Sequence, residues 1–400
     1  MAKKILLLSG NHICHNPRVV KEADAISQLG NNVEVLGMSF LPHLVKEDLE
    51  LVLSKRWKYT AVPGPLERRV NVKDFWYRLI RWVANLVASK TGIQTYAQLG
   101  GWKKDLLKQA RMRNVDLTIA HSPATLWVVR ELMRIGRKVA VDFEDWFSRE
   151  HVKGSWYPDK LITNLERDVI GRAIHATCTS EAMALAIAKA YGRKPIVIYN
   201  VFPLAEAPEP AADPGKDGPQ VLWISQALGP GRGLELLAKA LDLCEPKFRV
   251  TLVGNPQGNY RKNFANLIPQ AWKERVCFQK QINDKQVLKL ISKYHIGLAL
   301  EQDEPPNRDL TVTNKILQYL LCGLAVAATD TAGQREISLK AKAAVRLCGT
   351  DDAKGLAQNL NLLAGDADCL RKARWQARDV AQNLYCWEKE AIKIQNIFSA

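Results

Sequence analysis

The sequence lacks the residue spacings that mark several common kinds of site. Its eight cysteines are scattered singly, with no C-x-x-C pair and no cluster of His and Cys at metal-ligand spacing. This pattern argues against a disulfide scaffold and favours reduced thiols in a cytoplasm. The chain also has neither the Walker A loop G-x-x-x-x-G-K-[ST] nor the G-x-G-x-x-G fingerprint. The second absence argues against a nicotinamide-dependent dehydrogenase.

Long apolar runs are absent as well. After the first four residues, the run ILLLSGNH is too short for the apolar region of a signal peptide. No stretch approaches the roughly 20 apolar residues that a transmembrane helix requires. We therefore expect a cytoplasmic protein that is either in solution or bound peripherally at the inner face of the membrane.

The chain is long, globular in composition and basic. Its 400 residues are 47% hydrophobic and 24% charged, which predicts more than one folded core. The formal net charge is +16. Such an excess favours polyanionic partners, namely nucleic acid, an acidic membrane surface or phosphorylated substrates, without choosing among them.

The first half alternates buried strands with helices. Residues 4–9 and 33–38 form apolar runs, and residues 17–29 between them have helical spacing that ends at Gly30. This β-α-β opening predicts a parallel sheet with a right-handed crossover. Further strands are expected at 117–120, 139–141 and 175–179.

A proline-rich linker precedes a second series of strands. Residues 203–219 contain five prolines, which prevent a helix or a central strand. Helical spacing resumes at Leu234, and residues 379–398 predict a closing helix that could pack back on the first half. The expected strands of the second half are 220–224, 249–253, 276–278, 295–300 and 325–328. The prediction is two doubly wound, Rossmann-like domains (1–202 with 376–400, and 220–375) that face a cleft across the linker 203–219.

Two segments of the second half can hold a phosphate group. In SQALGPGRGLELL (225–237) a strand ends, a glycine-rich turn follows and a helix begins near Gly233, which gathers backbone N–H groups beside Arg232. In 313–336, Asn314 and Lys315 open a helix that ends at Gly323, and a turn is expected at Gly333. A lysine in the first turn opposes the helix dipole, so an anionic ligand would supply the compensating charge.

The second segment resembles a known family. The string NKILQYLLCGLAVAATDTAGQREI is similar to the donor-site signature of glycosyltransferase family four (glycosyl transferases group 1), whose common form is close to N-K-x-x-E-Y-x-x-x-G-x-P-V-V-A-T-D-x-G-G-x-x-E. The opening NPRVVKEADAISQLGNNVEVL, the segment IAHSP, the turn ALGPGRGLELLAKAL and the closing LYCWEKEAIKI resemble other parts of that family in the same order. The resemblance implies a GT-B fold with a C-terminal crossover helix.

The resemblance also implies an activity. The second domain would bind a nucleotide-diphosphate sugar and the first an acceptor, with transfer by retention and without a metal or a permanently bound cofactor. Arg232 would hold the diphosphate, Lys315 would assist, and His121 would contact the donor sugar. Further donor-side candidates are Gln226, Gly231, Gly233, Gly254, Glu301, Asp303, Thr313, Asn314 and Gln318. Acceptor-side candidates, at loops after strands of the first domain, are His12, His15, Asp142 and Glu144.

The sequence departs from the family at two glutamates. Gln318 stands where the family has the glutamate that binds the ribose hydroxyls. Leu310 stands at the position of the family's first glutamate, eight residues earlier. Gln318 can bond a ribose hydroxyl, although without the charge of a carboxylate. The departures leave two alternatives to sugar transfer open. The chain could be a binding or partner subunit that has lost catalysis, or a nucleotide-sugar epimerase.

Basic and aromatic residues gather between 68 and 113. Phe75, Leu79, Trp82, Val83 and Leu86 fall on one helical face, and Lys and Arg flank them. Tryptophan with flanking basic residues is typical of helices at the surface of an anionic membrane. The alternative is a helix whose apolar face packs on the core. Nucleic acid is disfavoured because no recognition module is visible. The resemblance to glycosyltransferase family four implies an acceptor that is a glycan, a lipid-linked molecule or another membrane-associated molecule, as in cell-surface polysaccharide or glycolipid synthesis.

Overall fold

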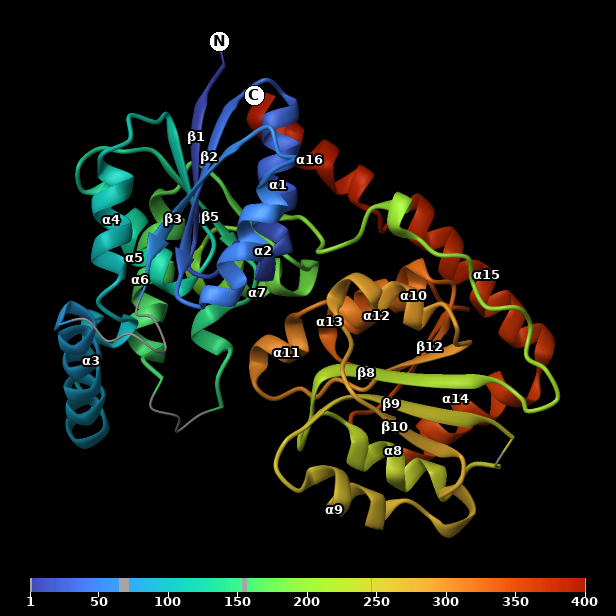
Figure 1. Ribbon diagram of the computed structural model, residues 1–400. Coiled ribbons are helices and arrows are strands. Elements are labelled where there is room, and N and C mark those ends of the chain that lie inside the picture. Colours follow the sequence, from blue (N-terminus) through green and yellow to red (C-terminus); the bar gives the residue numbers. More distant parts are fainter. Residues whose placement is uncertain (1, 65–71, 153–156, 246, 400) are drawn as a thin grey trace. The chain divides into compact units, whose positions relative to one another are not determined.

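The computed structural model describes residues 2–64, 72–152, 157–245 and 247–399. Contacts divide the chain into two compact units, each built around one parallel sheet (Figure 1). Unit 1 comprises Met1–Thr179, Met183–Ile198 and Ala391–Ala400, and unit 2 comprises Ser180–Ala182 and Tyr199–Glu390.

Unit 1 has a seven-stranded sheet in the order β3-β2-β1-β4-β5-β6-β7, with every described pair parallel. The chain moves outward from β1 to β3 and then returns to the other side of β1 with β4. Such a reversal leaves an opening at the carboxyl ends of the two central strands. The strands are β1 Lys4–Ser9, β2 Asn32–Ser39, β3 Lys58–Pro63, β4 Leu117–Ala120, β5 Val139–Phe143, β6 Ala176–Cys178 and β7 Ile196–Val197.

The crossovers of unit 1 are helical, as parallel strands require. The helix α1 begins at Pro17, after Asn16 accepts a hydrogen bond from the Val19 amide, and it ends before Gly30, which has a positive φ of 80°. The α-helices are α1 Pro17–Gln28, α2 Pro42–Val52, α3 Val72–Thr91, α4 Lys103–Arg111, α5 Pro123–Met133, α6 Asp159–Arg172 and α7 Glu181–Tyr191. Short 3₁₀ turns lie at Ile13–His15 (η1), Tyr96–Leu99 (η2) and Phe147–Arg149 (η3).

Unit 2 repeats this plan with six strands in the order β10-β9-β8-β11-β12-β13. The chain adds strands outward from β8 to β10 and then returns to the other side of β8 with β11, which is parallel to β8. The pairing of β8 with β9 is irregular between Ile224 and Ala227. The strands are β8 Gln220–Leu228, β9 Arg249–Pro256, β10 Val276–Gln279, β11 Ile296–Ala299, β12 Ala325–Thr329 and β13 Val345–Cys348. The α-helices are α8 Leu234–Leu241, α9 Tyr260–Leu267, α10 Val287–Ile291, α11 Pro306–Leu310, α12 Asn314–Leu321, α13 Ala332–Lys340, α14 Ala353–Gly365 and α15 Ala367–Asn383. The last helix, α16 Trp387–Ser399, begins in unit 2 and belongs to unit 1 from Ala391 onward.

Both faces of the sheet in unit 2 are covered. Val221 and Trp223 pack in one apolar cluster, whereas Leu222 and Ile224 pack in another. Successive residues of a strand point to opposite faces, so the continuous apolar run of β8 requires helices on both sides. Burial of such runs from water is the main driving force for these cores.

The expected strands are confirmed within two residues at almost every end, while β8 and β9 run three or four residues further. The sequence analysis missed β3, β7 and β13. Residues 379–398 are not one helix, because α15 ends at Asn383 and α16 begins at Trp387. The amides of Leu384 and Tyr385 share the Val380 carbonyl, and the Tyr385 ring packs edge-on against Tyr199. Tertiary packing therefore ends a helix that its periodicity would continue.

The expected turn at Gly333 is also wrong. Gly333 lies inside α13 and is buried, and a Cβ there would come within 2.4 Å of the Thr311 carbonyl oxygen. The residue is needed because two backbone segments approach closely, which the sequence pattern does not show.

Candidate functional site

Charged side chains gather at the carboxyl ends of the central strands in each unit. In unit 1 they follow β1, β4 and β5, and in unit 2 they follow β8 and β11. These are the places where the strand order reverses, and ligands of parallel α/β sheets bind at such places. The two clusters differ in composition, so each is described by itself.

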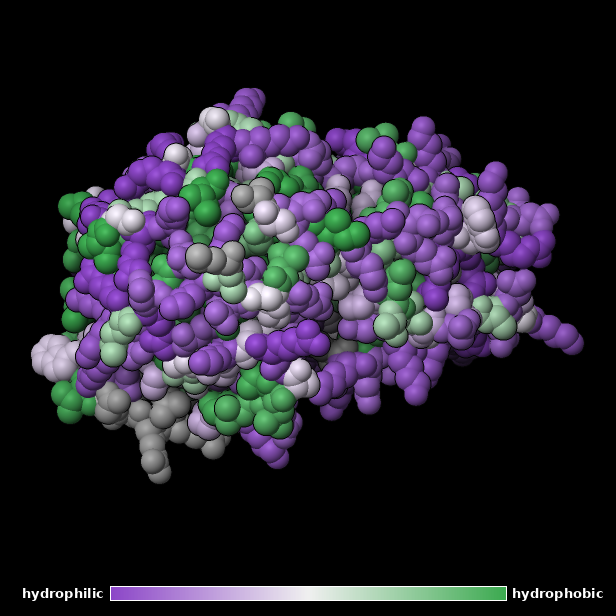
Figure 2. Space-filling view, turned by 90° about the horizontal axis from the view of Figure 1, so that it is seen from above, coloured by the Kyte–Doolittle hydropathy of each residue, from purple (hydrophilic) through white to green (hydrophobic). Residues whose placement is uncertain are grey.

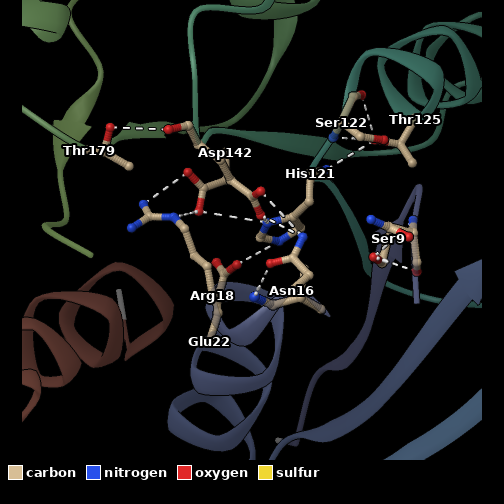
Figure 3. Close-up of polar contacts among 12 residues, drawn as sticks. Ser9, Asn16, Arg18, Glu22, His121, Ser122, Thr125, Asp142 and Thr179 are labelled. Atoms are coloured by element: carbon tan, nitrogen blue, oxygen red, sulfur yellow. Dashed lines mark hydrogen bonds and ion pairs between the residues drawn. The ribbon is translucent and has the colours of Figure 1, made fainter. Parts of the chain in front are cut away.

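In unit 1, five residues from three elements form a buried charge cluster (Figure 3). His121, directly after β4, lies between two carboxylates: its Nε2 is 2.7 Å from Glu22 and its Nδ1 is 3.0 Å from Glu144. Arg18 binds Asp142 through two hydrogen bonds of 2.7 and 2.9 Å. Arg18 and Glu22 are one turn apart on α1, which directs both side chains toward the ends of β4 and β5.

The cluster keeps His121 protonated. Burial disfavours the charged imidazole, but the negative charge of Glu22 and the contact with Glu144 outweigh burial and raise the pKa of His121 to about 10. Its side chain has no exposed surface. The contact with Glu22 is short but poorly aligned, so it acts as an ion pair rather than as a hydrogen bond. The expected contact of His121 with a sugar stays a prediction. In this structure the imidazole ring binds and orients the Glu144 carboxylate.

Glu144 is the member of the cluster that remains open to solvent. Its side chain is 23% exposed, compared with 3% for Asp142 and 6% for Glu22. The Asn16 amide donates to Glu144 at 3.0 Å, and the same Asn16 begins α1. Glu144 is thus held from two sides while its carboxylate stays accessible, which suits a group that binds or deprotonates a hydroxyl.

Glu22, His121 and Asp142 have ligand atoms within 4.8 Å of one another, so their geometry alone could surround a metal ion. The neighbouring charges oppose this use. Both oxygens of Asp142 already bind the Arg18 guanidinium, and a cation would repel both Arg18 and a protonated His121. The arrangement fits an internal ion-pair network better than a metal site.

The two histidines of the first loop have different surroundings. His12 is fully buried: Nδ1–H donates to Asp48 at 2.6 Å, and Nε2 accepts from the amides of Phe40 and Leu41 at 3.0 Å. Both ring nitrogens are therefore used inside the protein. His15 is exposed at the end of η1. The assignment of both residues to an acceptor stays a prediction, and the geometry favours His15.

In unit 2, the loop between β8 and α8 is shaped by glycines. Gly231 and Gly233 have positive φ angles of 68° and 75°. A Cβ at Gly233 would lie 2.2 Å from the Leu300 carbonyl oxygen, whereas one at Gly231 would meet open space. Gly233 is thus required for the loop to approach the end of β11 at the start of α8. This close approach brings the free backbone amides at the start of α8 beside the loop that follows β11.

Two arginines lie close together at this loop. Arg308, on α11, donates to the Gly231 carbonyl oxygen at 2.9 Å. Burial and then the positive charge of Arg232 lower the pKa of Arg308. Among the residues that the structure describes, Arg232 has no carboxylate partner. Glu301 also attracts Arg308, but it is already paired with Lys315, so positive charge is in excess at this loop and favours binding of a polyanion.

Lys315 has a partner within the protein. Its ammonium group forms an ion pair with Glu301, and it lies 5.7 Å from the centre of the Trp223 ring. The Glu301 carboxylate therefore supplies compensating charge within the protein, and the role of Lys315 at the donor phosphate stays a prediction. Of the two acidic donor-side candidates after β11, Glu301 is buried, whereas Asp303 is exposed.

The remaining donor-side candidates surround the same strand ends. Thr313 begins α12, and its hydroxyl is buried without a hydrogen-bond partner in the described part of the chain. Asn314 is exposed and accepts from Asn200, and Gln318 is half-buried on α12. Gln226 is exposed at the irregular part of β8. A Cβ on Gly254, in β9, would lie 2.9 Å from the Ser225 carbonyl oxygen, so β8 and β9 approach closely there.

Four site residues were not assigned from the sequence: Asn16, Arg18, Glu22 and Arg308. The first three lie in the segment NPRVVKEA, where charged residues among apolar ones on a helix signal a buried partner. No local signal marks Arg308, because the chain between Arg232 and Arg308 contains three strands, β9 to β11. Only the sheet brings the two arginines together.

Comparisons with known proteins agree with this architecture. Residues 218–366 match the family described as Glycosyl transferases group 1. A search of curated proteins finds no match to the sequence. Sucrose-phosphate synthase from Thermosynechococcus elongatus superposes with a TM-score of 0.73 and 15% identity, covering 99% of this chain and 98% of that one.

Two similar structures were determined with ligands. HepE from Anabaena, in complex with UDP-glucose, has a TM-score of 0.69 and 18% identity over 99% of both chains. A TarM variant from S. aureus, in complex with fondaparinux, α-GlcNAc-glycerol and UDP, has a TM-score of 0.69 and 10% identity over 100% of both chains. At these identities the likeness establishes the fold. The chain has the GT-B fold with two Rossmann-like sheets, and its residues 218–366 match the model of the Glycosyl transferases group 1 family.

Proposed function

We propose that the protein transfers a sugar, with retention of configuration, from a nucleoside-diphosphate sugar to a glycan or lipid-linked acceptor. The observation that carries this proposal is the Arg232–Arg308 pair beside the glycine loop of unit 2. Two fixed positive charges and the amides at the start of α8 match the charge of a diphosphate. UDP and UDP-glucose in the HepE complexes supply the chemical class of the donor.

In this mechanism the arginines act on the leaving group. When the bond between the sugar and the diphosphate breaks, negative charge develops on the phosphate oxygens, and the guanidinium groups of Arg232 and Arg308 stabilise it. The unpartnered hydroxyl of Thr313 can bond the donor, while Gln318 bonds a ribose hydroxyl. Retention follows if the leaving phosphate accepts the proton of the acceptor hydroxyl on the face from which it departs.

Unit 1 contributes the acceptor side. Glu144 is the accessible carboxylate of its cluster, so it binds a hydroxyl group of the acceptor, either the one that reacts or a neighbouring one. His121, protonated and buried, is then a positioning residue that orients Glu144. Glu22, Asp142 and Arg18 hold this histidine in turn.

Calorimetry with UDP and other nucleoside diphosphates tests the donor site. Arg232→Met and Arg308→Met should each weaken binding by about tenfold or more, since a charge-assisted hydrogen bond contributes roughly 1.5–3 kcal/mol. Lys239→Met on the exposed side of α8 is the matched control and should leave affinity unchanged. Absence of any nucleotide binding by the wild-type protein would refute the proposal. Binding without hydrolysis or transfer of a nucleotide sugar would favour a partner subunit instead.

A further inference from the structure

The helix α3, Val72–Thr91, exposes the face that a helix normally buries. Seven large apolar side chains between Phe75 and Val87 are 39–59% exposed. They are Phe75, Trp76, Ile80, Trp82, Val83, Leu86 and Val87. Spacings of three, four and seven residues place them on one side of the helix. By contrast, α5 of the same unit buries Leu126, Val128, Val129 and Leu132.

The side of α3 that packs against the rest of unit 1 carries polar and small residues. Its buried residues are Asp74 and Ala84. Lys73 pairs with Asp105 at 2.6 Å, and Asn85 accepts from Gln98 at 3.3 Å. The pattern is therefore inverted relative to a helix of a soluble core, whose apolar side faces inward.

Tyr77 and Arg81 fix this orientation. A Cβ on Gly101 would lie 2.1 Å from the Tyr77 ring, so the ring rests directly on that glycine. The Arg81 guanidinium lies 5.4 Å from the Trp102 ring and is half-buried, which lowers its pKa. These contacts come from the side opposite Trp82 and Val83, so the apolar side is directed outward by packing.

The surrounding charge indicates what covers this face. Between residues 72 and 113 the sequence has nine Lys and Arg residues but only two acidic residues, Asp74 and Asp105. Lys90, Lys104, Lys108 and Arg111 are exposed. A second copy of the chain would bring the same positive charge against it, whereas an anionic bilayer would neutralise it. Figure 2 shows one face of the molecule, on which hydrophilic side chains predominate and hydrophobic groups lie scattered among them.

We propose that α3 is a membrane-surface anchor that lies parallel to an anionic bilayer, with its apolar stripe in the region between headgroups and acyl chains. Its 20 residues form a rod about 30 Å long. Trp76 and Trp82 enter the interface, and the basic residues of α3 and α4 bind lipid phosphate groups. No helix in the described part of the chain is long and apolar enough to cross a bilayer. In this proposal, α3 inserts into one leaflet of the bilayer. Membrane binding is a separate property from the proposed sugar transfer, because it requires no nucleotide sugar.

Sedimentation of the full-length protein with vesicles tests this anchor. One set of vesicles is phosphatidylcholine, and in the other about a third of the lipid is phosphatidylglycerol. The wild-type protein should bind the anionic vesicles more tightly, and added salt should weaken that binding. Replacing Trp76, Ile80 and Trp82 together by Gln should reduce the partition coefficient by about tenfold or more, because interfacial binding scales with buried apolar area.

The triple variant has a matched control. Trp375→Gln with Leu339→Gln removes apolar side chains that are 70% and 62% exposed in unit 2, and vesicle binding should stay unchanged. All three replaced residues of α3 are at least half exposed, so thermal unfolding and nucleotide affinity should match the wild type. A wild-type protein that fails to bind anionic vesicles at low salt overturns the proposal, as does equal binding by the triple variant. A lipid-free dimer that the triple substitution dissociates would assign the face to a second copy and would overturn it too.

Discussion

The charge clusters of the two units differ in burial and in how their charges are balanced. In unit 1, Arg18 and a protonated His121 are matched by three carboxylates, and the cluster is almost completely buried. In unit 2, Arg232 and Arg308 gather like charges at a loop that stays partly open. Charges can be buried when they are paired inside the protein, while an unmatched set must keep water or a ligand beside it. The first arrangement is suited to holding a group in place, and the second to binding an anion.

Replacing one member of each cluster gives the largest expected contrast. Arg18→Leu should lower the free energy of unfolding by about 3–5 kcal/mol, because Asp142 would remain buried without its partner. Arg232→Leu should change it by less than about 1 kcal/mol, since no buried charge is left behind. Urea unfolding measures both.

Adding Asp142→Leu to Arg18→Leu sharpens the first result. The double variant should be more stable than Arg18→Leu alone, because the unpaired charge is removed. Equal destabilisation by the arginine substitutions in the two units would show that the distinction between them is wrong.

The glycine loop of unit 2 offers a second contrast, within one turn. Gly233→Ala should cost about 2 kcal/mol or more, since the residue has a positive φ and the new methyl group would overlap the Leu300 carbonyl. Gly231→Ala has a similar φ but open space around it, and should cost about 1 kcal/mol. Thermal unfolding distinguishes them. A Gly231→Ala variant that is the less stable of the two would contradict the close approach at Gly233.

The pH dependence of stability tests the buried histidine of unit 1. The pKa of His121 is raised from 6.5 to about 10 in the folded protein, so its contribution is fully present below pH 6.5 and is lost as the pH rises toward 10. The difference in unfolding free energy between wild type and His121→Gln should therefore shrink by more than about 1 kcal/mol between pH 6 and pH 9. A difference that grows with pH would mean that His121 is neutral.

The sequence predicted the parts of each site that follow directly from a strand. Gly231, Arg232 and Gly233 follow β8, and His121 follows β4, so the strand pattern alone placed them at the carboxyl edges of the sheets. It did not predict that Arg308 lies within electrostatic range of Arg232, or that Lys315 already has Glu301 as a partner. Such pairings depend on the order of strands in the sheet and on side-chain direction.

The α3 helix shows the same division between local and tertiary information. Its periodicity placed Phe75, Trp82 and Leu86 on one face, because a helix has a fixed rotation per residue. Periodicity left open whether that face turns toward the core or away from it. The packing of Tyr77 on Gly101 decided that it faces outward.

By itself, the sequence determined the two-sheet architecture and the loops that carry charge, because apolar periodicity and glycine positions act over a few residues. Only the tertiary structure decided which of those charges neutralise one another and which remain for a ligand. Electrostatic pairing depends on distances of a few ångströms between residues such as Glu22 and His121, which are almost a hundred positions apart in the chain.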